Sequence, residues 1–169
     1  MSMVILEIPE VKGECRVKTK QVDFTDMILC ESLAQDMEVE MEVTTNARRT
    51  VHTPKVNNIT LERKWDIASP KLISLLLRAG VKGETWKIHC VKPLGDDEFQ
   101  WVEFLTLELT NPLLSKHSLS VSEGDTTESL EINATKITWV YKQYDEKQTS
   151  QGGGGVSFDL LTGAVGGAS

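Results

Sequence analysis

Cysteine is scarce in this sequence, and the few cysteines present are not spaced as pairs. Among 169 residues there are three, Cys15, Cys30 and Cys90, and no C-x-x-C motif occurs. An odd number without paired spacing argues against a disulfide framework, so we expect folding with reduced thiols, as in a cytoplasm. The three histidines also lack an H-E-x-x-H motif or any other metal-ligand spacing. We therefore expect neither a metal site nor another cofactor.

Positive charge and long apolar runs are scarce too. The chain has 18 Lys and Arg against 25 Asp and Glu, which gives a formal net charge of −7. Nucleic acids and anionic membranes attract clustered positive charge, so neither is an expected partner. No apolar run approaches the length of a membrane span, and we predict no membrane insertion. The apolar start Met1–Ile8 lacks a basic stretch and is followed by Pro9, so no cleaved signal peptide is expected.

Residue patterns that support catalysis are missing as well. On a strand, the adjacent His89 and Cys90 would point to opposite faces, so they could not act on one ligand locally. The carboxylates of Asp96–Glu98 share one solvated turn, whereas an acid–base pair needs two different environments. The glycine run Gly152–Gly155 lacks the Gly-Lys-Ser/Thr ending of a phosphate-binding loop. We therefore expect no catalytic residue and no enzymatic activity.

The sequence does contain the alternation that is typical of β-strands. Its hydrophobic content of 40% over 169 residues is enough for one domain with a core. Met37–Val43 alternates strictly between apolar residues and three glutamates, which predicts a half-buried strand with an acidic outer face. Further strands are expected at Val4–Ile8, Glu14–Lys18, Val22–Leu33, Ile59–Trp65, Trp86–Val91, Phe99–Leu109, Leu113–Val121 and Leu130–Tyr141. Strands at this spacing favour a mainly β fold, either a closed or nearly closed antiparallel barrel or a sandwich.

The last of these segments has two halves that are out of phase. Leu130 and Ile132 share one face, whereas Ile137 and Trp139 fall in the opposite phase. A β-bulge between the two halves would reconcile them within one strand.

The end of the chain is rich in glycine. We expect residues 1–150 to form a single domain, and residues 151–169 to form a link and a short tail. Within this tail, Gln151–Gly155 is predicted to be flexible, and Val156–Val165 is apolar enough to dock on a neighbour.

One helix is predicted, at about Ser69–Gly80. Ser69 is a good N-cap, and Pro70 occupies the first helical position, where its missing N–H costs nothing. Arg78 lies in the last turn, and Gly80 can adopt the left-handed conformation that ends a helix. One face of the helix carries apolar residues at helical spacing, namely Leu72, Leu75, Leu76 and Ala79.

A long polar stretch, at about residues 44–56, lacks periodicity and is predicted to be a loop. Loops of this length are often functional. Arg48 and Arg49 within it allow two interpretations, which the sequence leaves open. Either they lie on a solvated turn, or the loop docks on an acidic surface such as the glutamate face of Met37–Val43 in another copy.

The segment Ile59–Gly80, ITLERKWDIASPKLISLLLRAG, resembles the strand–helix segment of the Hcp (haemolysin-coregulated protein) family of type VI secretion systems. Other segments are similar to the family in the same order, namely Val11–Cys15 (VKGEC), Arg49–Pro54 (RTVHTP), Lys136–Lys142 (KITWVYK) and Val156–Leu160, in which Phe158 stands where the family has Trp. The chain also departs from the family: Cys15 replaces a serine, and Lys18–Lys20 stands where a histidine is common.

This resemblance implies a β-barrel of two packed sheets with one flanking α-helix, assembled as a homohexameric ring. Such rings stack into the inner tube of a contractile sheath, capped by a VgrG-type spike, and carry or chaperone secreted effector proteins. The protein would be made in the bacterial cytoplasm and then secreted when the system fires. Two alternatives stay open: a tail-tube protein of a phage or phage-like contractile particle, and a monomeric ligand-binding β-barrel.

Two sets of residues are candidates for contacts in such a ring. In the loop Thr44–Val56, Arg48, Arg49 and His52 are candidate ring-stacking residues. The expected strand Val22–Leu29 is a candidate lining of the lumen, with Val22, Phe24, Thr25 and Ile28 facing the cargo.

Overall fold

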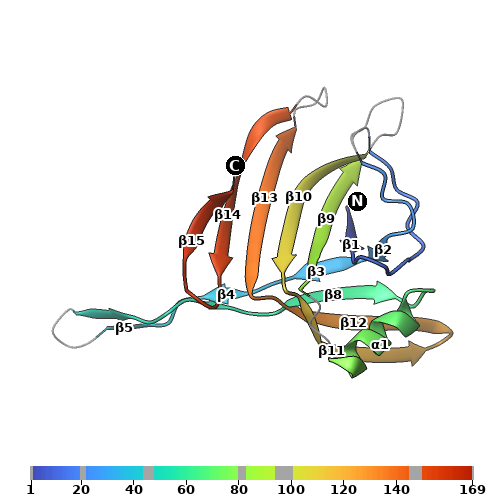
Figure 1. Ribbon diagram of the computed structural model, residues 1–169, viewed down its shortest axis with the longest axis horizontal. Helices are drawn as coiled ribbons and strands as arrows, with labels where there is room; N and C mark the ends of the chain where they lie inside the picture. Colours follow the sequence, from blue (N-terminus) through green and yellow to red (C-terminus); the bar gives the residue numbers. More distant parts are fainter. Residues whose placement is uncertain are drawn as a thin grey trace.

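The protein is built from β-sheets, with one helix in the described part of the chain. The computed structural model describes residues 2–19, 22–43, 48–79, 83–93, 101–144 and 150–168. Figure 1 shows a large upright sheet, a second sheet across its lower end, a short helix in front of β11 and β12 of that sheet, and an arm that projects to one side. The expected mainly β fold with one flanking helix is confirmed.

The large sheet has seven antiparallel strands. Their spatial order is β15 (Val165–Ala168), β14 (Ser150–Asp159), β13 (Lys136–Tyr144), β10 (Trp101–Thr110), β9 (Thr85–Pro93), β1 (Met3–Glu7) and β2 (Ile28–Cys30). The expected strand Trp86–Val91 lies within β9, which pairs along its length with β10. Alternation gives this sheet two different faces, because Ile88 and Cys90 point into the main core whereas Val91 belongs to a smaller cluster.

The second sheet has four antiparallel strands and closes the main core. Its order is β11 (Leu113–Ser122), β12 (Asp125–Asn133), β8 (Ile59–Lys64) and β3 (Ser32–Ala34). Glu123 and Gly124 both have positive φ, 52° and 82°, in the two-residue turn between β11 and β12. Such turns match the twist of a hairpin. Buried side chains from both sheets form one core, including Leu6, Leu61, Leu107, Leu130 and Ile137.

The expected single strand Leu130–Tyr141 is wrong. The chain forms β12 and β13, which belong to different sheets. Leu130 and Ile132 enter the core from one sheet, and Ile137 enters it from the other. The reversal of phase therefore marks the passage of the chain between two layers, and not a bulge within one strand.

The expected strand Val22–Leu33 is also divided between the two sheets. Only Ile28–Cys30 (β2) and Ser32–Ala34 (β3) are strands, and a bend at Glu31 separates them. Asp26, with a φ of 67°, turns the chain just before β2. The predicted strand Glu14–Lys18 is largely irregular, with one bridge from Lys18 to Asp23.

Helix α1 (Ser69–Arg78) packs against β11, with Leu72 fully buried. The predicted N-cap is wrong, because Ala68 holds the cap position and Ser69 lies inside the first turn with Pro70. At the other end Ala79 adopts the left-handed conformation, with a φ of 48°. The predicted role of Gly80 falls outside the described residues.

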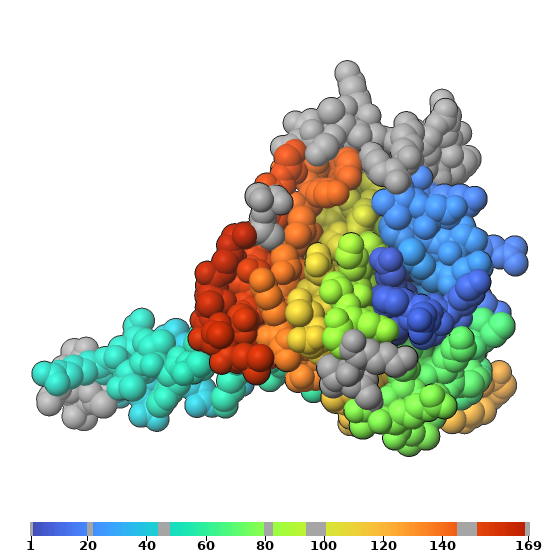
Figure 2. Space-filling model, in the orientation of Figure 1, coloured from blue at the N-terminus to red at the C-terminus, as the bar shows by residue number. Residues whose placement is uncertain are grey.

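The stretch expected to be a loop forms part of the projecting arm (Figure 2). Two short antiparallel ladders build the arm: β4 (Met37–Glu38) with β7 (Lys55–Val56), and β5 (Met41–Val43) with β6 (Arg49–Val51). The expected half-burial of Met37–Val43 is wrong, since its apolar residues are all exposed. Apolar and acidic residues do alternate in this segment, but its apolar side does not pack against the core of the subunit.

The C-terminal segment is a strand where a flexible link was expected. Residues Ser150–Asp159 form β14 along β13, and β15 then returns along β14. Glycine is required at position 153, since a Cβ there would come within 2.0 Å of the Tyr141 carbonyl oxygen. The glycines therefore permit close pairing of strands at this place.

Candidate functional site

The arm, defined here as residues 37–43 and 48–56, is the candidate functional surface of this molecule. Partners across an antiparallel ladder project from the same face. Met41 lies opposite Val51, and Val43 lies opposite Arg49. The exposed fractions are 56% for Met41, 73% for Val43 and 61% for Val51. One face of the β5–β6 ladder is therefore largely apolar and open.

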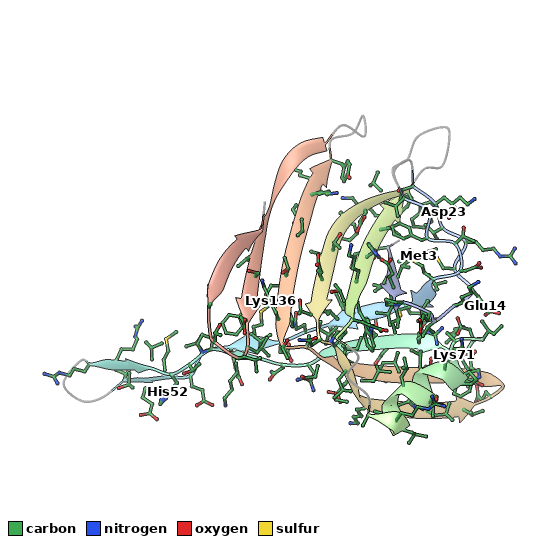
Figure 3. The ribbon with its side chains drawn as sticks, viewed as in Figure 1. Met3, Glu14, Asp23, His52, Lys71 and Lys136 are labelled. Atoms are coloured by element: carbon green, nitrogen blue, oxygen red, sulfur yellow. The ribbon has the colours of Figure 1, made fainter. Side chains whose placement is uncertain are left out.

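The polar side chains of the arm form exposed ion pairs. Lys55 Nζ donates to Glu40 Oε1 at 3.0 Å, and this hydrogen bond raises the pKa of the lysine ammonium. His52 Nε2 lies 3.7 Å from Glu42 Oε1. Figure 3 shows His52 on the arm, far from Lys71 of the helix. Exposed pairs of this kind contribute little to stability.

A groove of about 410 Å³ lies where the arm meets the large sheet. Its walls are mostly apolar and come from both parts, namely Met37, Val39, Pro54 and Val56 of the arm and Trp139, Val156, Phe158 and Val165 of the sheet. The indole N–H of Trp139 donates to Gln35 Oε1 at 2.9 Å, which holds the ring against the base of the arm. The arm therefore presents two apolar features, the open face of the β5–β6 ladder and the groove at its base.

The structure separates the predicted site residues. Arg49 and His52 lie exposed on the arm, and Arg48 immediately precedes β6. Of the predicted lumen residues, Val22 and Thr25 are exposed, but Phe24 and Ile28 are fully buried. The prediction for Phe24 and Ile28 is wrong, because side chains packed inside the subunit cannot face a cargo.

Sequence analysis missed a buried ionic network beneath the helix. Arg63, with 1% of its side chain exposed, forms ion pairs with Glu128 of β12 and with Asp66, where the Nη2–Oδ2 distance is 2.5 Å. Burial alone would lower the pKa of Arg63, but these two carboxylates outweigh it and raise the pKa. The signal was present in the sequence, since Arg63 continues the inward alternation of Ile59 and Leu61.

Ser69 joins this network and explains the Asp-x-x-Ser-Pro spacing. Its hydroxyl accepts from Arg63 Nη1 at 3.1 Å and from the Asp66 amide at 3.0 Å, and it donates to Glu128 Oε1 at 3.0 Å. His117 Nε2 contacts the other Glu128 oxygen at 2.8 Å. Every group has a charged or polar neighbour, so the network anchors the helix to the four-stranded sheet.

A second titratable cluster lies on the outer face of the large sheet. His89 Nδ1 is 2.6 Å from Glu103 Oε1, and His89 Nε2 is 2.9 Å from Glu7 Oε2. The expectation that His89 and Cys90 point to opposite faces is confirmed, since Cys90 lies in the main core. Sequence analysis missed the trio, because its members come from three strands.

The cysteines lack the features of nucleophiles. All three are buried and free. Burial raises the pKa of Cys30 to about 12 and that of Cys90 to about 11, so their thiolates do not form near neutral pH. Within the described ranges, no three His, Cys, Asp or Glu side chains are grouped so as to hold a metal ion. In the same part of the chain, no helix has the length and apolar character needed to cross a membrane.

Comparisons with solved structures show the same fold. A protein described as "Structure of a type six secretion system protein" aligns with a TM-score of 0.81 and 17% identity, over 98% of this chain and 100% of the other. Hcp1 from Salmonella typhimurium aligns with a TM-score of 0.68 and 15% identity, over 97% and 98%. Hcp1 from E. coli EAEC 042 aligns with a TM-score of 0.67 and 17% identity, over 94% of this chain and 97% of the other.

Comparisons of sequence give two further results. No curated protein matches the chain. The family described as "Type VI secretion system effector, Hcp" matches residues 5–141, which is most of the chain and includes the arm, the helix and the buried network. The chain therefore belongs to the Hcp family of type VI secretion system proteins.

Proposed function

We propose that this Hcp-family tube protein assembles as homohexameric rings that stack into the inner tube of a type VI secretion system. The observation that carries the proposal is the arm, whose exposed apolar face and basal groove have no covering element among the described residues. Full burial of a large aliphatic side chain contributes about 1.5–3 kcal/mol, so covering this surface with another copy would be strongly favourable.

The β5–β6 ladder of the arm and the seven-stranded sheet present different patches of the subunit. A contact that joins two different patches of identical subunits is heterologous, and it closes into a ring when its rotation permits. An arm that covers a patch of the next subunit suits such a contact. Family membership favours a tube of a secretion system over the phage-particle alternative.

Finer roles are proposed for individual residues and for partner proteins. Arg48, Arg49 and His52 are proposed to contact the next ring, and Val22 and Thr25 are proposed to face the lumen. The VgrG-type spike, the sheath and secreted effectors are proposed partners, and secretion follows assembly in the cytoplasm.

The test is the mass and shape of the particle in solution. Size-exclusion chromatography with light scattering should give six subunits, and negative-stain images should show rings. Met41→Glu/Val51→Glu places two charges on the apolar face of the arm and should shift the population toward monomer. Leu77→Glu, at an exposed leucine of the helix, is the matched control and should leave rings intact. A wild-type protein that is a clean monomer would refute the proposal and favour a monomeric binding barrel.

A further inference from the structure

Three charged side chains meet on the outer face of the seven-stranded sheet, away from the arm. Glu7 is the last residue of β1, His89 lies in the middle of β9, and Glu103 lies at a bulge in β10. His89 is only 6% exposed, yet each of its ring nitrogens is within hydrogen-bond distance of a carboxylate oxygen. The hydroxyl of Thr106 also donates to Glu103.

The geometry requires a particular protonation state. A neutral imidazole has one N–H, whereas an imidazolium has two. With a carboxylate at 2.6 Å from Nδ1 and another at 2.9 Å from Nε2, both nitrogens donate when His89 is an imidazolium. Charge-assisted hydrogen bonds of this kind are about twice as strong as neutral ones. Both hydrogen bonds from His89 to the carboxylates therefore form when His89 is charged.

Other charged groups surround the trio on neighbouring strands. Lys87 stands between Glu7 on β1 and Glu108 on β10, in register with both. Lys142 on β13 lies near enough to Glu103 to help lower the pKa of that carboxyl. Burial alone would lower the pKa of His89, but the hydrogen bonds to Glu103 and Glu7 outweigh it and raise the pKa.

The trio supports a flap, defined here as residues 9–19 and 22–27. The flap begins just after Glu7 and crosses the outer face of the sheet before it returns at β2. On the way back, Phe24 packs on the imidazole of His89, with ring centroids 4.9 Å apart. Phe24 and Cys15 of the flap form a small buried cluster with Ile5 and Val91 of the sheet. In Figure 3, Asp23 marks the flap and Met3 marks the neighbouring β1.

We propose that Glu7, His89 and Glu103 form a pH-sensitive latch, which holds the flap on the sheet while His89 is an imidazolium and releases it when His89 loses a proton. Loss of that proton to solvent leaves a nitrogen lone pair facing a carboxylate. Glu103 is 14% exposed and held by Thr106, whereas Glu7 is 40% exposed and can turn into water. Glu7 then no longer bonds to His89, and the ring beneath Phe24 loses one of its two carboxylate partners.

The direction of the pH effect follows from the two pKa shifts. The pKa of His89 is raised above 6.5, so the latch is closed at mildly acidic pH and opens as pH rises through the raised value. The pKa of Glu103 is lowered below 4.5, so its carboxylate stays charged throughout that range.

Hydrogen exchange measured peptide by peptide, from pH 6 to pH 9, tests the latch. The amides of Gly13, Cys15, Phe24 and Asp26 donate to carbonyls within the flap, and packing of Cys15 and Phe24 on the sheet holds these bonds away from solvent. After correction for the pH dependence of intrinsic exchange, these amides should lose protection as pH rises and the flap leaves the sheet. The protection factor should fall by up to about tenfold for each pKa unit by which the pKa of His89 is higher with the flap closed than with it open. Peptides of β8 and β12 should keep constant protection.

Two variants and a control make the result decisive. His89→Gln cannot be charged, so its flap should exchange rapidly with no pH dependence. Glu7→Gln offers an amide to a neutral imidazole, so it should weaken the pH dependence without unfolding the sheet. Glu62→Gln, at an exposed carboxylate of β8, should behave as the wild type. Constant flap protection in the wild type, or equal pH dependence in Glu7→Gln and the wild type, would overturn the proposal even if His89→Gln does not fold.

Discussion

Among single residues, Arg63 is the one whose position matters most for the stability of the fold. A guanidinium that is 1% exposed stays charged because Asp66 and Glu128 surround it. Removal of one partner from a buried pair leaves an uncompensated charge, which is far more costly than the pair itself. Ser69 ties the same charge to the first turn of α1, so this network couples the helix to the four-stranded sheet.

We therefore expect Glu128→Ala to destabilise the protein strongly. The loss should be about 3 kcal/mol in the free energy of unfolding, because Arg63 keeps only Asp66 of its two carboxylate partners and His117 loses its contact with Glu128. Urea denaturation at a fixed subunit concentration measures it. Glu62→Ala, at an exposed site on the adjacent β8, is the control and should change stability by less than about 0.5 kcal/mol. Equal effects of the two substitutions would contradict the role assigned to the network.

Among the elements, those specified by local signals were predicted well. The helix was found from its proline and its apolar spacing, which both act over a few residues, whereas its left-handed end lies at Ala79 and not at the residue predicted. Its cap was predicted wrongly because the Ser69 hydroxyl is engaged by Arg63 and Glu128, which is a long-range contact. The prediction of one strand over Leu130–Tyr141 was wrong for a related reason. Alternation indicates which side chains are buried, but not which sheet they belong to.

The arm shows the same limit of sequence reasoning. Its alternation indicated one strand over Met37–Val43, whereas the structure has two short strands, β4 and β5, interrupted at Val39 and Glu40. The half-buried assignment also assumed a core within the subunit. The latch trio was out of reach, because only the pairing of β1, β9 and β10 brings Glu7, His89 and Glu103 together. Contacts between distant strands therefore account for most of what the sequence did not predict.

The C-terminal strands give a test at the scale of one element. Gly153→Ala would place a Cβ 2.0 Å from the Tyr141 carbonyl oxygen, which forces β14 away from β13. We expect a loss of about 1–3 kcal/mol in the free energy of unfolding. Gly154→Ala is a matched control, since its Cβ would meet nothing within 4 Å and it lies next in the same strand. Urea denaturation that ranks the two variants equally would contradict a required glycine at position 153.

The whole molecule has more surface than a compact monomer of its mass needs. Its accessible surface is 10630 Å², whereas a folded monomer of 18.8 kDa is expected to have about 8,300 Å². The arm, which projects from the rest of the molecule, contributes to this large surface (Figure 2). Coverage of this surface by neighbouring copies, as in the proposed ring, would reduce the surplus.

Stacking of rings should then depend on the charges carried by the arm. Arg48 and Arg49 lie at the start of β6, and the glutamates of Met37–Val43 offer an acidic surface on another copy. A single exposed ion pair contributes only about 0–1 kcal/mol, and in the proposed ring it would be repeated at every subunit. Such a contact should weaken as salt screens it.

We expect Arg48→Glu/Arg49→Glu to shorten tubes under tube-forming conditions while it leaves single rings intact. Negative-stain electron microscopy measures the distribution of tube lengths. Lys116→Glu/Lys136→Glu makes the same change of charge at exposed lysines outside the arm and should leave tube length unchanged. Adding Glu40→Lys/Glu42→Lys to the arginine variant restores opposite charges and should recover longer tubes. Tubes of wild-type length in the arginine variant would show that ring stacking does not use these two arginines.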